Sequence, residues 1–156
     1  MEKMLIRGVA RDNDVARIAV VGVEDTPGIA FKIFSALAKA EINVDMILQS
    51  IGRNGTKDIA FTTTKANLQP TLDILEGLKD ILKYQELSHR DDLSKVSIVG
   101  AGMAHNPGVA ATMFEALFGA QINIHMIATS EIKVSVLINQ SNAEKAVQVI
   151  HEKFVK

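Results

Sequence analysis

The sequence contains one pattern twice, and this internal repeat constrains the fold more than any other feature. Thr26–Ile47 and Asn106–Ile127 lie 80 positions apart and are identical at 11 of 22 positions. Both copies contain a Pro-Gly pair, a stretch of helical length and then alternating apolar residues typical of a strand. A repeat of this length indicates that the chain folds into two similar units, and that its function depends on the pair.

Composition narrows the class of protein. With 156 residues, 47% of them hydrophobic, the chain can form one moderate domain or two small ones with a true core. The net charge of −1 and the scattered basic residues argue against nucleic-acid binding, and no apolar run or signal segment indicates a membrane partner. The lack of cysteine excludes disulfides and zinc–thiolate sites. We therefore expect a cytoplasmic protein.

The first copy predicts a strand, a helix, two strands, a second helix and a closing strand. Thr26 is expected to cap the first helix with its hydroxyl, because Pro27 then occupies the first helical position. Along the fourth element Ile59 and Phe61 are expected to point inward. The expected ranges are Ala16–Val23, Pro27–Ala40, Ile42–Gln49, Lys57–Thr64, Leu68–Leu78 and Leu82–Leu87.

The second copy repeats this order but lacks the closing strand. Its expected elements are the strand Val96–Val99, a helix from Pro107, the strands Ile122–Thr129 and Lys133–Asn139, and a helix opened by Ser141. A surplus apolar segment, Met4–Val9, precedes the first copy, and we expect it to cross over and complete the second unit. The predicted fold class is α+β, with two ferredoxin-like βαββαβ units. They comprise residues 13–90, and residues 91–156 with 3–10.

The two repeated segments also carry a family resemblance. VARIAVVGVEDTPGIAFKIFSALAKAEINVDMILQS resembles the first ACT unit of aspartate kinases. KVSIVGAGMAHNPGVAATMFEALFGAQINIHMIATSEIKVSVLI is similar to the second, with Ser130–Ile138 especially characteristic. The resemblance runs from Gly8 to Phe154 and includes no kinase domain. It implies the regulatory region of an aspartate kinase, made as a separate (beta) subunit or as the C-terminal part of a longer enzyme.

The resemblance also implies a ligand, partners and cofactors. The ligand would be lysine, threonine or both, acting as feedback inhibitors of aspartate-family amino-acid biosynthesis. The partners would be an aspartate kinase catalytic domain or subunit and a second copy of the chain, since an isolated ACT unit leaves sheet edges uncovered. ATP and magnesium would belong to the catalytic part, so we expect no cofactor on this chain.

The first copy offers a physically reasonable site for an amino acid. The backbone amides of Gly28, Ile29 and Ala30 lie at a predicted helix N-terminus, which favours a carboxylate. Asp25 is expected to bind the ammonium, and Gln49 offers both a donor and an acceptor for the rest of the ligand.

The resemblance adds two residues of the second unit to this pocket. Asn123 and Ile124 would close it across an interface. Binding would then favour the inhibited arrangement of the units and shift the population towards it.

Other interpretations of the same chain are weaker. Gly100–Gly102 lacks the third glycine of a dinucleotide fingerprint. His105 and His125 have no evident third ligand, so we expect no metal site. Ser130 and Glu131 lack the context of a nucleophile elbow, so we expect no catalytic residues. The alternatives that remain are an ACT pair that regulates another enzyme or transcription, and a small ferredoxin-like enzyme.

Overall fold

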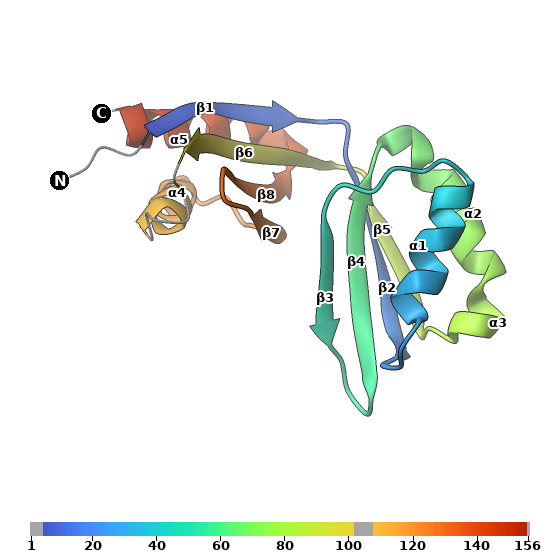
Figure 1. Ribbon diagram of the computed structural model, residues 1–156. Helices are drawn as coiled ribbons and strands as arrows, with labels where there is room; N and C mark the ends of the chain where they lie inside the picture. The colour runs from blue at the N-terminus through green and yellow to red at the C-terminus, as the bar shows by residue number, and fades with distance from the viewer. Residues whose placement is uncertain (1–4, 102–107, 156) are drawn as a thin grey trace. The chain divides into compact units, whose positions relative to one another are not determined.

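The computed structural model describes residues 5–101 and 108–155 (Figure 1). The chain divides into two compact units: a first unit, Asp14–Asp91, and a second unit made of Met1–Asn13 and Asp92–Lys156. Each unit contains one four-stranded sheet in which the paired strands are antiparallel, together with helices. The predicted α+β fold with two ferredoxin-like units is confirmed.

The first unit has the sheet order β3-β4-β2-β5, with α1 and α2 packed on one face. The apolar stripe of α1, formed by Ile29, Ile33 and Leu37, is buried against strand residues that include Ile59 and Phe61. Burial of such side chains is the main favourable term in folding. The elements are β2 (Ala16–Glu24), α1 (Ile29–Lys39), β3 (Ile47–Ile51), β4 (Thr56–Thr63), α2 (Leu68–Gly77), α3 (Lys79–Leu82) and β5 (Glu86–Arg90), with a 3-10 turn at Lys65–Asn67.

The start of α1 differs from the prediction. The helix begins at Ile29, and Gly28 is its N-cap with φ 92° and ψ −9°. None of the described side chains caps it, so the expected cap by Thr26 is wrong. These angles are those of the third residue of a type II turn, which favours Pro at the second position and Gly at the third. Pro27 and Gly28 therefore turn the chain into the helix, and the helix starts one residue later.

The strand that follows α1 also starts later than expected. The prediction began it at Ile42, whereas β3 begins at Ile47. The preceding residues are held to β4 by an irregular pattern: the Met46 N–H donates to the Thr62 hydroxyl (3.0 Å), and the Asp45 N–H donates to the Thr62 carbonyl (3.0 Å). All five residues of β3 are exposed, because β3 is an edge strand of the sheet. The predicted closing strand at Leu82–Leu87 likewise shifts to β5, since Leu82 ends α3.

The second unit has the sheet order β1-β6-β8-β7. Val9 is the register partner of Ile98, and Ala10 of Ser97, so the predicted crossover of the N-terminal strand is confirmed (Figure 1). Its core joins α4 and α5 to this sheet. The elements are β1 (Leu5–Asp12), β6 (Leu93–Ala101), α4 (Gly108–Gly119), β7 (Met126–Thr129), β8 (Lys133–Asn139) and α5 (Ala143–Val155), with a 3-10 turn at Gln140–Asn142.

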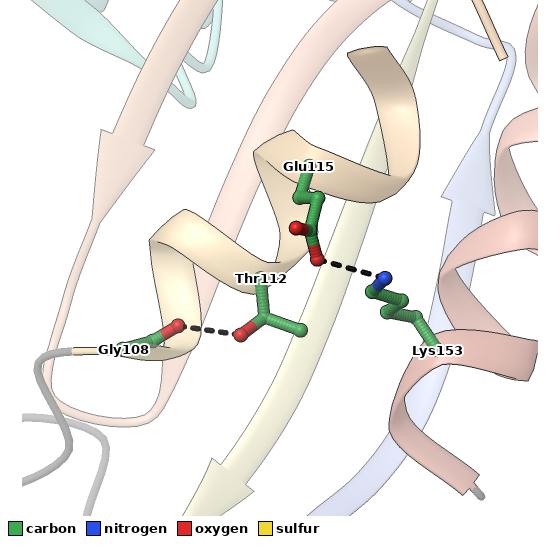
Figure 2. A network of polar contacts seen from close by, with 4 residues as sticks. All are labelled: Gly108, Thr112, Glu115 and Lys153. Atoms are coloured by element: carbon green, nitrogen blue, oxygen red, sulfur yellow. Dashed lines mark hydrogen bonds and ion pairs between the residues drawn. The ribbon is translucent and has the colours of Figure 1, made fainter. Parts of the chain in front are cut away.

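Polar contacts on the surface of the second unit link its two helices (Figure 2). The Lys153 ammonium of α5 lies 2.7 Å from the Glu115 carboxylate of α4, and both side chains are exposed. Within α4, the Thr112 hydroxyl donates to the Gly108 carbonyl at 2.8 Å. An exposed ion pair contributes at most about 1 kcal/mol, so the apolar core and not this pair holds the helices together.

Candidate functional site

The loop between β2 and α1 of the first unit is anchored at two points near the end of β2. On β2, Val20 is paired with Ile59 and Val23 with Lys57, which is the mark of a β-bulge. Gly22 supplies the left-handed conformation in the bulge (φ 74°) and its N–H donates to the Asp58 carboxylate at 2.9 Å. Val20 and Val23 are three positions apart, so in a regular strand they would point to opposite faces. Because of the bulge, both side chains reach the core.

The second anchor is the β3–β4 hairpin. The Asp25 N–H donates to the Gly55 carbonyl at 2.9 Å, so the residue that follows the end of β2 is tied to the hairpin. Asn54 and Gly55 both have positive φ, as a tight hairpin turn requires. The backbone that carries the Asp25 side chain is therefore held to the β3–β4 hairpin at two points.

The N-terminus of α1 follows directly. The first amides of a helix have no acceptor within it, and the first intrahelical bond here runs from the Lys32 N–H to the Gly28 carbonyl (3.0 Å). No side chain caps α1, Gly28 is exposed, and a Cβ on Gly28 would meet nothing within 4 Å among the described atoms. The buried Ile29 side chain anchors this turn in the core, while Ala30 is half-buried. The arrangement favours an anion at this end of the helix.

An ion pair lies beside this turn. The Lys57 ammonium is 3.5 Å from the Asp25 carboxylate, with side-chain exposures of 11% for Lys57 and 56% for Asp25. The sequence-based prediction missed Lys57. A signal was present, because Lys57 stands two positions before Ile59 and therefore on the inward face of β4, where a charged residue is unusual.

Gln49 lies on the same face of the sheet as this pair. Directly opposed residues of antiparallel strands point to one face. Gln49 is opposite Ile59 and Ile51 is opposite Lys57, so Gln49 belongs to the face that carries α1. Its side chain is exposed because β3 is at the edge. Of the predicted residues, Asp25, Gly28–Ala30 and Gln49 thus all belong to the helix-bearing side of the first unit.

The other two predicted residues belong to the second unit. Asn123 and Ile124 lie between α4 and β7; Asn123 is exposed, and Ile124 is half-buried and packs on the core of its own unit. Their contribution to a pocket with Asp25 stays a prediction.

The corresponding positions of the second unit carry different chemistry. Phe61 is paired with Ile18 and Ile47, and Val136 holds the same place between Val96 and Ile127. Counted back along this register, Ile132 corresponds to Lys57, but it is 58% exposed and lies in the turn before β8, which the bond from the Ser130 N–H to the Lys133 carbonyl closes. His105, the counterpart of Asp25, lies outside the described residues. Because Ile132 carries no charge, the described part of the second unit has no cation that corresponds to Lys57.

The described residues form few other features that resemble a functional site. An open cleft of about 470 Å³ in the first unit lies at the hairpin end of the sheet and contains none of the predicted effector residues; it is lined by Val21, Gly22, Ile51, Gly52, Arg53, Asn54, Thr56, Asp58 and Gln85. Among the described residues, no three His, Cys, Asp or Glu side chains gather as metal ligands would. His125 Nε2 instead lies 2.8 Å from Asn139 Oδ1. No helix in residues 5–101 or 108–155 has the length and apolarity needed to cross a membrane.

Comparison with known proteins agrees with this architecture. Residues 17–83 and 96–154 each match the ACT domain family. The aspartokinase of Mycolicibacterium smegmatis is 44% identical over 156 residues, which is 99% of this chain and 37% of that protein, so the chain spans well under half of the relative's length.

Two solved structures are similar over nearly their whole chains. One contains aspartokinase alpha and beta subunits; it is 45% identical with a TM-score of 0.90, over 97% of this chain and 99% of that chain. The other is the ligand-free regulatory subunit of aspartate kinase from Thermus thermophilus, 43% identical with a TM-score of 0.91, over 96% and 99%. The chain therefore belongs to the aspartokinase family, in which it corresponds to the regulatory region built from two ACT domains.

Proposed function

We propose that this chain is the allosteric sensor of an aspartate kinase and binds lysine, threonine or both in its first unit. The observation that carries the proposal is the uncapped N-terminus of α1 beside the Asp25–Lys57 ion pair. An α-amino acid carries a carboxylate and an ammonium on the same carbon atom. The α1 amides and Asp25 offer the complementary charges.

Regulation follows if the ligand binds two arrangements of the ACT units with different affinity. An effector that prefers the inhibited arrangement shifts the population towards it by no more than its difference in affinity. Asn123 and Ile124, on the second unit, would supply that difference by contacting the ligand only in one arrangement. The kinase reaction itself, with its ATP and magnesium, would take place on a catalytic domain or subunit.

We also propose that the working form contains two copies of the chain. All five residues of β3 are exposed, and three of them, Ile47, Leu48 and Ile51, are large and apolar. An exposed edge strand with apolar side chains is a ready partner for another strand. A symmetric pair of chains covers such an edge on both copies at once. Sedimentation at micromolar concentration, with and without the amino acid, tests this, and a monomer in both conditions would refute it.

The binding proposal is tested by titration calorimetry with the twenty amino acids. We expect lysine or threonine to bind, and Asp25→Asn to weaken binding by about 30-fold or more, because a charge pair shielded by ligand loses about 2–5 kcal/mol when one partner is removed. Asp80→Asn, an exposed acid on α3, is the matched control and should bind as the wild type does.

Three results would count against this proposal. Equal affinity in Asp25→Asn and wild type would remove the site from the first unit. Tight binding of a different amino acid would favour regulation of another enzyme. No binding of any amino acid would refute the sensor function.

A further inference from the structure

Lys57 is buried at a position of β4 where an apolar residue would be expected. Its residue exposure is 9%, and it is opposite Val23, a fully buried core residue, on one side and opposite Ile51 on the other. Lysine is almost never buried unless it is paired, because removing an ammonium from water is costly. The four-carbon stem can lie along apolar surface, but the head must find compensating charge.

Among the described residues, Asp25 compensates the Lys57 charge only in part. An ammonium has three N–H donors, and Asp25 presents one carboxylate oxygen at 3.5 Å, longer than the usual 2.7–2.9 Å or so of a charged hydrogen bond. The Asp25 side chain is also 56% exposed, so water screens its charge. Lys57 therefore retains donors and positive potential for a further anion on the side of the sheet that carries α1.

We propose that the Lys57 ammonium binds the carboxylate of the effector and thereby restricts this site to free α-amino acids. The proposal rests on the proposed function, because the ligand must be an amino acid held near Asp25. The effector's ammonium then lies on Asp25 and its carboxylate lies between Lys57 and the α1 amides. A carboxamide or a simple amine would bring a second cation towards Lys57 without the anion that compensates it, and like charges at close range repel.

The repeat supplies an internal comparison. The two units share their fold and the Pro-Gly pair of the repeat, but the residue that corresponds to Lys57 by count is Ile132, which is uncharged and lies in the turn before β8. The cation is thus not a requirement of the ACT sheet. It belongs to the first unit, where it accompanies Asp25.

The test is titration calorimetry of the complete 156-residue chain with threonine, lysine and their carboxamides. Lys57→Met keeps an unbranched apolar stem and removes the charge, whereas Lys57→Arg keeps the charge. Lys39→Met, at the exposed end of α1, is the matched control. Far-ultraviolet circular dichroism and thermal unfolding of each variant report whether it is folded.

We expect wild type to bind the free amino acid at least about tenfold more tightly than its carboxamide. Lys57→Met should lose about tenfold or more for the amino acid, while its affinity for the carboxamide stays the same or rises. Lys57→Arg and Lys39→Met should remain within about threefold of wild type.

Two results would overturn this role. One is unchanged affinity of Lys57→Met for the amino acid; the other is an equal loss for amino acid and carboxamide, which would mean that Lys57 only shapes the loop. If the carboxamide binds too weakly to detect, the two Lys57 variants are compared for their affinity for the free amino acid. An equal loss of affinity in Lys57→Met and Lys57→Arg would overturn the role, and a loss in Lys57→Met alone would support it. The proposed function fails separately, by loss of binding in wild type or by wild-type affinity in Asp25→Asn.

Discussion

Gly28 and Gly108 are equivalent positions of the repeat, but replacing each with alanine should change the free energy of unfolding differently. Gly28 has φ 92° and a Cβ there would meet nothing within 4 Å among the described atoms, so Gly28→Ala introduces backbone strain without a clash. A left-handed alanine costs about 1–2 kcal/mol, and the lower entropy of the unfolded chain returns about 0.4–1 kcal/mol. We therefore expect a net destabilisation of about 1 kcal/mol.

Gly108 is the first residue of α4 and is not in the left-handed region, and a Cβ there would likewise meet none of the described atoms within 4 Å. Gly108→Ala should leave stability unchanged or raise it by up to about 1 kcal/mol, because alanine suits a helix better than glycine. The two variants should thus differ by about 1–2 kcal/mol in the free energy of unfolding.

Thermal and urea unfolding measure this difference. For a chain of this size, about 1 kcal/mol corresponds to roughly 2–4 °C in Tm. Gly28→Asn is the control, since asparagine tolerates the left-handed region, and it should recover part of the loss in Gly28→Ala. Equal stability changes in Gly28→Ala and Gly108→Ala, or no recovery in Gly28→Asn, would refute the assignment of a strained turn at Gly28.

Three further predictions follow from other parts of the fold. Deleting residues 1–12 removes β1, so amide exchange should lose protection in β6 while β2 keeps it; loss confined to β2 would contradict the crossover. Burial, and secondarily the charge of Glu76, raises the pKa of Tyr84 above 10.0, so its contribution to stability is present below pH 10 and lost as pH rises through the folded pKa. In unfolding titrations at alkaline pH, Tyr84→Phe should lose less stability than wild type. At neutral pH this variant should be about 1 kcal/mol less stable than wild type, since the Tyr84 hydroxyl donates to the Leu75 carbonyl at 3.3 Å. Ile51→Lys on β3 should weaken self-association measured by sedimentation, with unchanged Tm of the monomer, whereas unchanged association would exclude β3 from the contact.

The sequence predicted the fold well because repetition and periodicity are properties of long segments. The repeat set two units, and the count of strands required the N-terminal segment to complete the second sheet, as the pairing of β1 with β6 shows. The exact start of individual helices and strands was predicted less well. Pro27-Gly28 fits both a capped helix start and a type II turn, and distant contacts decide between them, including the bond from Asp25 to Gly55.

The candidate site shows the same division. Asp25, Gln49 and the Gly28 turn could be named from local pattern and from the resemblance, whereas Lys57 was missed. It stands 32 positions after Asp25 in the sequence and reaches it only through the register of β2 and β4. A bulge at Gly22 sets that register at the relevant end, and a bulge leaves no periodic signal in the sequence.

The crossover of β1 makes the first unit an insertion within the second. The 78 residues from Asp14 to Asp91 interrupt one fold between two strands that are direct neighbours, since Asp12 is opposite Lys95. While the inserted unit is folded, its own ends are held together, because Arg17 is opposite Arg90. If it unfolds, pairing β1 with β6 must close a flexible loop of that length, at a cost of about 4 kcal/mol in chain entropy. A ligand that keeps the first unit folded therefore also stabilises the second, through covalent connectivity alone and without any contact between their surfaces.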